Sequence, residues 1–103
     1  MKKQQGDVII KSASSIPQGA KIVPARKRGF ILAEGEETGH AHVINDLETE
    51  VFEKDGVIFI KTSKSINIIH EEHKPITIES GIWQVGIVKE YDPFTEEIRQ
   101  VRD

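Results

Sequence analysis

The chain has 103 residues, no cysteine, and a formal net charge of −3 that results from 14 basic and 17 acidic side chains. This length predicts a single β domain over residues 1–103, and the missing cysteines exclude a disulfide framework. The charge balance makes a nucleic-acid partner unexpected, because proteins that follow a phosphate backbone need an excess of Lys and Arg.

The N-terminal residues MKKQQGDVIIKS have a basic start but only three consecutive apolar residues. A signal peptide needs a longer apolar run, and a membrane-spanning helix needs about twenty apolar residues. We therefore expect a soluble cytoplasmic protein with no membrane association.

Short apolar runs separated by turn residues then predict an all-β fold. Asp55-Gly56 lies between two apolar runs and is typical of a tight hairpin turn with positive backbone φ. Residues 14–20 read as a loop, and residues 21–29 start extended and become a basic turn. This spacing is typical of a small barrel or sandwich of antiparallel strands. The expected strands cover residues 6–12, 29–35, 38–46, the two halves of 48–63, 65–72, 75–80 and 82–92.

The C-terminal residues 93–103 suit either a short helix or an extended tail. Asp92 could cap such a helix, and Pro93 would occupy its first position. Two helical turns are marginal in isolation, so both alternatives remain open.

All four histidines fall in two short motifs, GHAH at 39–42 and HEEH at 70–73. In a strand, His40 and His42 point to the same face with Cα atoms about 6.5–7 Å apart, so that two ring nitrogens can converge on one ion. His70 shares its strand face with Ile66 and Ile68, and His73 can join it if the chain turns before Pro75. HEEH is not the metalloprotease motif, which requires two residues between Glu and the second His.

We therefore predict that His40, His42, His70 and His73 bind a divalent metal ion, with Zn, Fe, Mn and Ni not distinguished. The spacing leaves open whether such an ion would support zinc hydrolysis, non-haem iron chemistry or no catalysis. Simpler interpretations are solvated histidines, or a charged turn in which Glu71 and Glu72 pair with the imidazoles. Carboxylates that could complete the site are Asp46, Glu48, Glu90 and Asp92.

A metal-free alternative uses two histidines as general acid and base on a phosphodiester, since imidazole titrates near neutrality. Lys27 and Arg28, in the only dense basic cluster, would then hold the phosphate. The net negative charge of the chain counts against this alternative.

Two segments, residues 35–46 and 77–85, resemble the two metal motifs of a known family. GEETGHAHVIND (35–46) is similar to the first cupin metal motif, with a glycine, His-x-His and an acid, and Asp46 falls near the acid position. TIESGIWQV (77–85) is similar to the second cupin motif, but Gln84 occupies its histidine position. The resemblance implies that His70 or His73 would have to replace that ligand.

A resemblance over nearly the whole chain links it to small uncharacterised proteins of bacteria and their phages. The motifs that carry it are QGDVII, ILAEGEETGHAH, HEEHKPITIESGIWQV, KEYDP and IRQVRD. This resemblance implies no activity, but it raises an alternative function. A phage-type structural protein would self-associate or join a larger assembly such as a capsid, its location would be the virion, and its histidines would be interface groups.

Overall fold

The structure is a computed structural model that describes residues 2–34 and 39–87. Within these residues it contains ten strands and no helix, which confirms the all-β prediction. The strands are β1 (Lys2–Gln5), β2 (Val8–Ala13), β3 (Lys21–Ile22), β4 (Phe30–Glu34), β5 (Ala41–Ile44), β6 (Glu50–Lys54), β7 (Val57–Thr62), β8 (Ile66–Ile68), β9 (Ile76–Ile78) and β10 (Gly81–Ile87).

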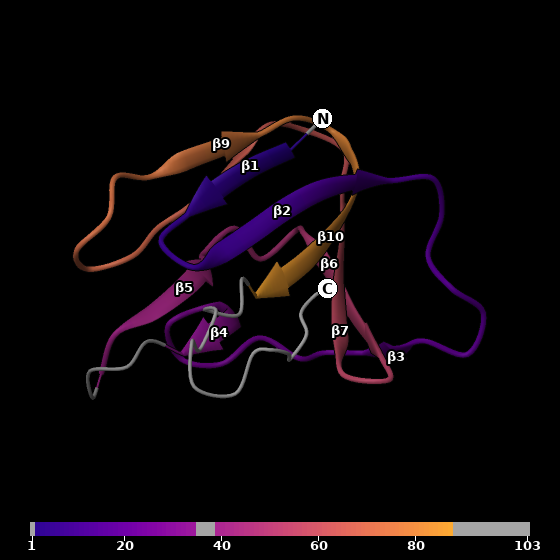
Figure 1. Cartoon of the computed structure of the whole chain (residues 1–103). Coiled ribbons are helices and arrows are strands. Elements are labelled where there is room, and N and C mark those ends of the chain that lie inside the picture. The colour runs from indigo at the N-terminus through magenta and orange to yellow at the C-terminus, as the bar shows by residue number, and fades with distance from the viewer. Residues whose placement is uncertain (1, 35–38, 88–103) are drawn as a thin grey trace, which may run out of the picture.

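Six strands form the main antiparallel sheet in the order β1-β2-β10-β7-β6-β3. The other four form the pairs β4–β5 and β8–β9, and a bridge between Val43 and Ile69 joins them edge to edge. These four strands form a second layer. Its strand β9 lies beside β1 of the main sheet (Figure 1), where Lys3 Nζ donates to the Thr77 carbonyl at 2.6 Å. The arrangement is a two-layered β domain.

The hydrophobic core draws side chains from both layers. In β2, for example, Val8 and Ile10 are fully buried while Lys11 is exposed, as expected for strands that bury one face. Because most core residues are β-branched or aromatic, the strand preference of the sequence and its burial pattern agree. The core cluster consists of Val8, Ile10, Phe30, Leu32, Ile44, Val51, Ile60, Ile66, Ile68, Ile78, Trp83 and Val85.

Two tight turns close the hairpins of the main sheet. Asp55 and Gly56 have φ values of 53° and 81°, so the predicted turn between β6 and β7 is confirmed. The strand predicted over 6–12 is wrong at its start, because Gly6 and Asp7 form the turn between β1 and β2. Here only the glycine has a positive φ, 60°, which is the pattern of a type II′ hairpin turn.

The strands around the second histidine motif are shorter than predicted. The strand expected over 65–72 ends at Ile68, and the Nδ1 atom of His70 accepts a hydrogen bond from the Glu72 amide at 3.0 Å. This local contact turns the chain instead of extending the ladder. The strand expected over 82–92 is described up to Ile87, which is half exposed, and residues 88–103 with the C-terminal helix prediction lie outside the described residues.

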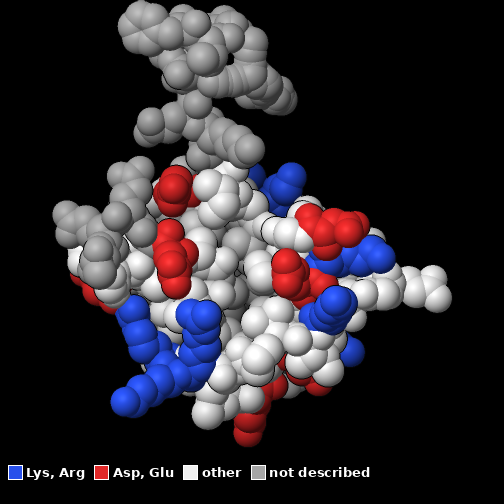
Figure 2. Space-filling view, turned by 90° about the horizontal axis from the view of Figure 1, so that it is seen from below, with Lys and Arg blue, Asp and Glu red and all other residues white. Residues whose placement is uncertain are grey.

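Acidic and basic side chains lie interspersed on the face of the molecule in Figure 2. Basic side chains gather at one margin of that face, with acidic side chains close to them. Among the described residues, no helix is long and apolar enough to cross a membrane.

Candidate metal centre

The two histidine motifs meet in space although 27 residues separate them in the sequence. His40 lies just before β5 and His42 is its second residue, while His70 and His73 lie in the loop between β8 and β9. The ring of His70 is central, with centroid distances of 4.4 Å to His42, 4.7 Å to His73 and 5.7 Å to His40. The rings of His42 and His73 are 6.1 Å apart and nearly parallel. All four predicted residues therefore belong to one cluster.

A short backbone bridge explains why the two motifs meet. The amide of Val43 donates to the Ile69 carbonyl and the amide of Ile69 donates to the Val43 carbonyl, each at 2.9 Å. This pair joins the neighbours of His42 and His70, so the two imidazoles are held side by side. The turn between β1 and β2 lies at the same end of the molecule, next to β5 and the β8–β9 loop (Figure 1).

Glu71 fastens the histidine loop to the start of β5. Its Oε1 accepts a hydrogen bond from the Ala41 amide at 2.9 Å, and its Oε2 pairs with the guanidinium of Arg28. Arg28 also donates to the Gly39 carbonyl at 2.8 Å. The Ala41 amide and, to a smaller extent, Arg28 lower the pKa of Glu71 to about 2. Glu71 therefore places a permanent negative charge beside the imidazoles.

His40, His70 and Glu71 form a group whose ligand atoms all lie within 4.8 Å of one another. The two histidines are half-buried and the carboxylate is exposed. A metal with bonds of about 2.0–2.2 Å to nitrogen and oxygen needs its ligand atoms about 3–4 Å apart, so these side chains would close in on the ion when it binds. Two imidazoles and one carboxylate also leave further coordination positions for water or a substrate.

His42 is the most buried member of the cluster, with 2% of its surface exposed. Its Nδ1 lies 2.8 Å from Oε1 of Gln5, and its Nε2 lies 3.8 Å from Oδ1 of Asp7. Burial and the neighbouring His70 lower the pKa of His42, and Asp7 opposes them only in part. The ring is therefore neutral at neutral pH and carries one unprotonated nitrogen.

His73 is exposed and packs against the turn between β1 and β2. A Cβ atom at Gly6 would lie 2.6 Å from Nε2 of His73. Gly6 is favoured by its positive φ, and a larger residue there would also have to displace the imidazole of His73. The ring of His73 occupies the place where a larger residue in the turn would project.

Two carboxylates proposed from the sequence lie elsewhere. Asp46 and Glu48 both pair with Lys64, at 3.1 Å and 3.0 Å. The Glu48 backbone amide, followed by Lys64, lowers the pKa of Asp46. Asp46 therefore stabilises a local turn, and its placement gives no support to a cupin-like acid ligand. Glu90 and Asp92 lie outside the described residues.

Sequence reasoning missed Gln5 and Asp7 and placed Arg28 in another role. A signal for these two residues was present in the sequence. Gly6-Asp7 is a recognised two-residue hairpin turn, which contains Asp7 and is directly preceded by Gln5. Arg28, proposed as a phosphate ligand, does lie at the centre, but its guanidinium is bonded to Glu71. Gln84, at the cupin histidine position, lies in β10 opposite Lys11 and Phe59 in the main sheet.

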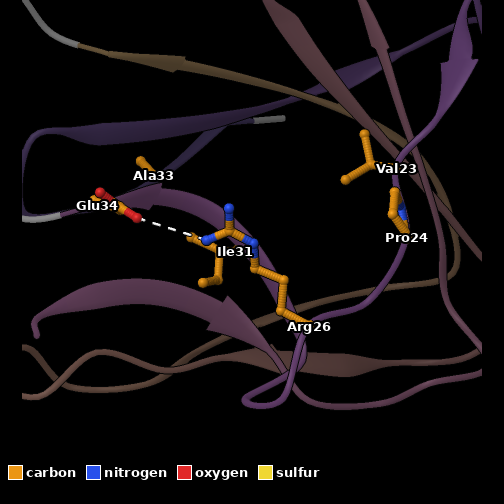
Figure 3. A pocket seen from close by; sticks show the side chains of 6 residues that line it. All are labelled: Val23, Pro24, Arg26, Ile31, Ala33 and Glu34. Atoms are coloured by element: carbon orange, nitrogen blue, oxygen red, sulfur yellow. Dashed lines mark ion pairs between the residues drawn. The ribbon is translucent and has the colours of Figure 1, made fainter.

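A separate cleft of about 280 Å³ opens on the other side of β4 and contains none of the histidines. In Figure 3 Val23 and Pro24 form one wall, and Ile31, Ala33 and Glu34 form the other. Arg26 reaches across toward Glu34, with 3.7 Å between charged atoms, but both side chains are largely exposed. The cleft offers a mixed apolar and charged lining without a buried polar group.

Comparisons with known proteins supply a family but no activity. No curated protein and no solved structure matches the chain. The comparisons show no link to cupins and none to phage proteins. Residues 4–87 match the family described as a domain of unknown function (DUF8820), and the chain belongs to that family.

Proposed function

We propose that this protein binds a divalent metal ion at the histidine cluster. His40, His70 and Glu71 supply the first three ligand atoms, and His42 and His73 line the same centre. One observation carries the proposal: two distant motifs that contain every histidine of the chain converge on a single cluster, with a carboxylate anion in reach.

The donor types support a transition metal over Mg²⁺ or Ca²⁺. Imidazole nitrogens suit Zn, Fe and Ni, and a carboxylate also accommodates Mn, whereas Mg²⁺ and Ca²⁺ prefer all-oxygen sites. The anionic Glu71 offsets part of the charge of the cation. With three protein ligands the ion retains positions for water or a small substrate, so its role is accessory or weakly catalytic.

The metal-free phosphodiester alternative is less well supported by the same contacts. It needs Arg28 to hold a phosphate, but the guanidinium of Arg28 is already paired with Glu71 and the Gly39 carbonyl. It also needs one histidine to act as a general acid, whereas burial keeps His42 neutral. Metal binding uses the anionic Glu71 carboxylate and unprotonated imidazole nitrogens, so it needs neither a free Arg28 nor a protonated histidine.

The test is titration of untagged, chelator-treated protein with zinc by calorimetry. Wild-type protein is expected to bind one zinc ion, and the double variant His40→Ala, His70→Ala to lose that binding. Glu71→Gln is expected to weaken binding, while Glu53→Gln, an exposed glutamate of β6, serves as the matched control and binds as wild type does. Equal zinc binding by wild type and the double variant would overturn the proposal.

A second candidate, self-association or a place in a larger assembly, is favoured by one observation. β3 lies at the edge of the main sheet, and its Ile22 is 78% exposed. Exposed edge strands can pair with another chain. The proposed interface role of the histidines does not suit His42, which is buried within its own chain. Light scattering tests this candidate: a mass of 11.6 kDa at high concentration would reject it.

A further inference from the structure

The side chain of Gln5 forms three hydrogen bonds at the base of the histidine cluster. Its Nε2 donates to the carbonyl of Ile68 and to the carbonyl of Lys74, each at 2.9 Å. Its Oε1 lies 2.8 Å from Nδ1 of His42. Only 2% of the residue is exposed, so within the described part of the chain these three contacts satisfy an amide that water barely reaches.

The two carbonyl contacts decide which way the amide faces. Carbonyl oxygens only accept hydrogen bonds, so the NH₂ group of Gln5 must point at Ile68 and Lys74. The amide oxygen must then face His42, and an oxygen without a proton can only accept. It follows that Nδ1 of His42 carries a proton and donates to Gln5, so the nitrogen that this ring can offer to a cation is Nε2.

We propose that Gln5 is a positioning residue that fixes the proton of His42 on Nδ1, so that His42 offers Nε2 to the cation as a further ligand. Metal-bound histidines are commonly oriented in this way by a hydrogen bond from the other ring nitrogen. Here Nε2 lies on the side of Asp7, whose carboxylate is 3.8 Å away and adds negative charge for a cation. The ligand role rests on the proposed metal binding; the proton position does not.

The same amide also fixes the loop that carries the second motif. Ile68 and Lys74 are the residues at the two ends of the segment that contains His70 and His73. One NH₂ group therefore holds both ends of that loop while the oxygen orients His42. Gln5 couples the two histidine motifs through a single side chain from β1.

The experiment measures the tautomer of His42 by long-range ¹H–¹⁵N correlation in the intact, metal-free chain and again after zinc is added. We expect the proton on Nδ1, and we expect zinc to shift the Nε2 resonance. A proton on Nε2 in the metal-free protein would overturn the inference without touching metal binding. Zinc-dependent shifts at His40 and His70 but not at Nε2 of His42 would overturn only the ligand role of His42.

Two variants separate the two functions of Gln5. Gln5→Glu retains an acceptor for Nδ1 but loses both donors, so the tautomer should persist while the loop is released. Gln5→Leu loses all three contacts and should yield mixed tautomers and zinc binding weakened about ten- to a hundredfold. Gln4→Leu, on the neighbouring exposed residue of the same strand, is the matched control: it loses one exposed hydrogen bond, to the Gly6 carbonyl, but none of the buried contacts, and should stay close to wild type. Wild-type zinc affinity in a folded Gln5→Leu protein would contradict the positioning role.

These outcomes remain distinct from a failure of the proposed function. If no histidine resonance of the wild-type protein responds to zinc, metal binding and the ligand role of His42 are both overturned. The proton on Nδ1 is read before any metal is added, so it is decided independently of that result.

Discussion

Two hairpins of this protein turn on the same residue types in opposite order. Asp55-Gly56 joins β6 to β7, and Gly6-Asp7 joins β1 to β2. Their surroundings differ: a Cβ at Gly56 would meet no atom within 4 Å, whereas one at Gly6 would meet Nε2 of His73. The first turn only reverses the chain, while the second also forms a wall of the candidate centre.

The strands that lead into these turns differ in the same way. β6 and β7 pair with each other over five residue pairs and bury Val51 and Ile60, which are near in sequence. β1 ends in Gln5, whose partners Ile68 and Lys74 are 63 and 69 positions away. A substitution in the β6–β7 turn should therefore have local effects only, whereas one near Gly6 should also alter the positions of the histidine rings.

The largest effect is expected from Gln5→Leu beside Gln4→Leu. Loss of the amide leaves the Ile68 and Lys74 carbonyls and Nδ1 of His42 without their partner, and an unsatisfied buried polar group costs about 1–3 kcal/mol. We expect the free energy of unfolding to fall by about 3 kcal/mol in Gln5→Leu, because water can reach part of the loop, and by less than about 0.5 kcal/mol in Gln4→Leu. Urea unfolding measures both, and equal values would show that the buried contacts of Gln5 do not stabilise the fold.

Zinc should raise the free energy of unfolding only while the histidine cluster is intact, and changes in the β6–β7 hairpin should not affect this gain. At free zinc one hundred times above Kd, binding to the native state adds about 2.7 kcal/mol to the free energy of unfolding. Wild type and Gly56→Ala should show this gain, and His40→Ala, His70→Ala should not. The measurement is urea unfolding with and without zinc, and a gain retained by the double variant would contradict the site.

Alanine substitutions at the two turn glycines test whether the two turns differ. Both glycines have positive φ, so Gly6→Ala and Gly56→Ala should each lose about 1–2 kcal/mol through backbone strain. Only Gly6→Ala should also displace the imidazole of His73, which is at the end of an exposed side chain and can swing away. Chemical shifts of the His73 ring and zinc affinity read out this difference; if both variants shift them equally, the turns are equivalent.

The smallest effect concerns acid stability and tests the contact between Glu71 and the Ala41 amide. The pKa of Glu71 is lowered from 4.5 to about 2 in the folded chain, so its contribution is present above pH 4.5 and is lost as the pH falls toward 2. Glu71→Gln lacks the ionisable carboxyl and should not lose this stability. The urea midpoint of the metal-free variant should therefore depend less on pH between 4.5 and about 2 than that of wild type. Glu53→Gln should retain the wild-type profile, and an unchanged profile in Glu71→Gln would refute the assignment.

Much of the fold follows from local patterns in the sequence. Alternating burial in β2 and β10, the Asp55-Gly56 turn and the strand preference of Ile and Val all act between near neighbours, so they can be read from the sequence. The pattern of turn residues around the second motif was less informative. The Glu72 amide donates to Nδ1 of His70 and the strand ends early, which the alternation of apolar residues does not predict.

The candidate centre was predicted in part for a different reason. The concentration of every histidine in two motifs can be counted in the sequence, and it predicted the four rings that the structure brings together. Of the acids proposed from the sequence, Asp46 and Glu48 pair with Lys64, and Glu90 and Asp92 lie outside the described residues. Glu71, not among those acids, is held beside the rings by the Ala41 amide and Arg28. A carboxylate next to a histidine in sequence need not be next to it in space.

The sequence by itself determined the all-β class, the β6–β7 hairpin and the identity of the histidines that gather, because strand propensity, two-residue turns and composition are local or countable. Only the tertiary structure decided that the Val43–Ile69 bridge sets His42 beside His70, that Gln5 reaches both ends of the histidine loop, and that Glu71 is the nearby anion. These contacts join residues 26 or more positions apart. Their formation depends on the packing of two sheets around a common core, which no single segment of the chain specifies.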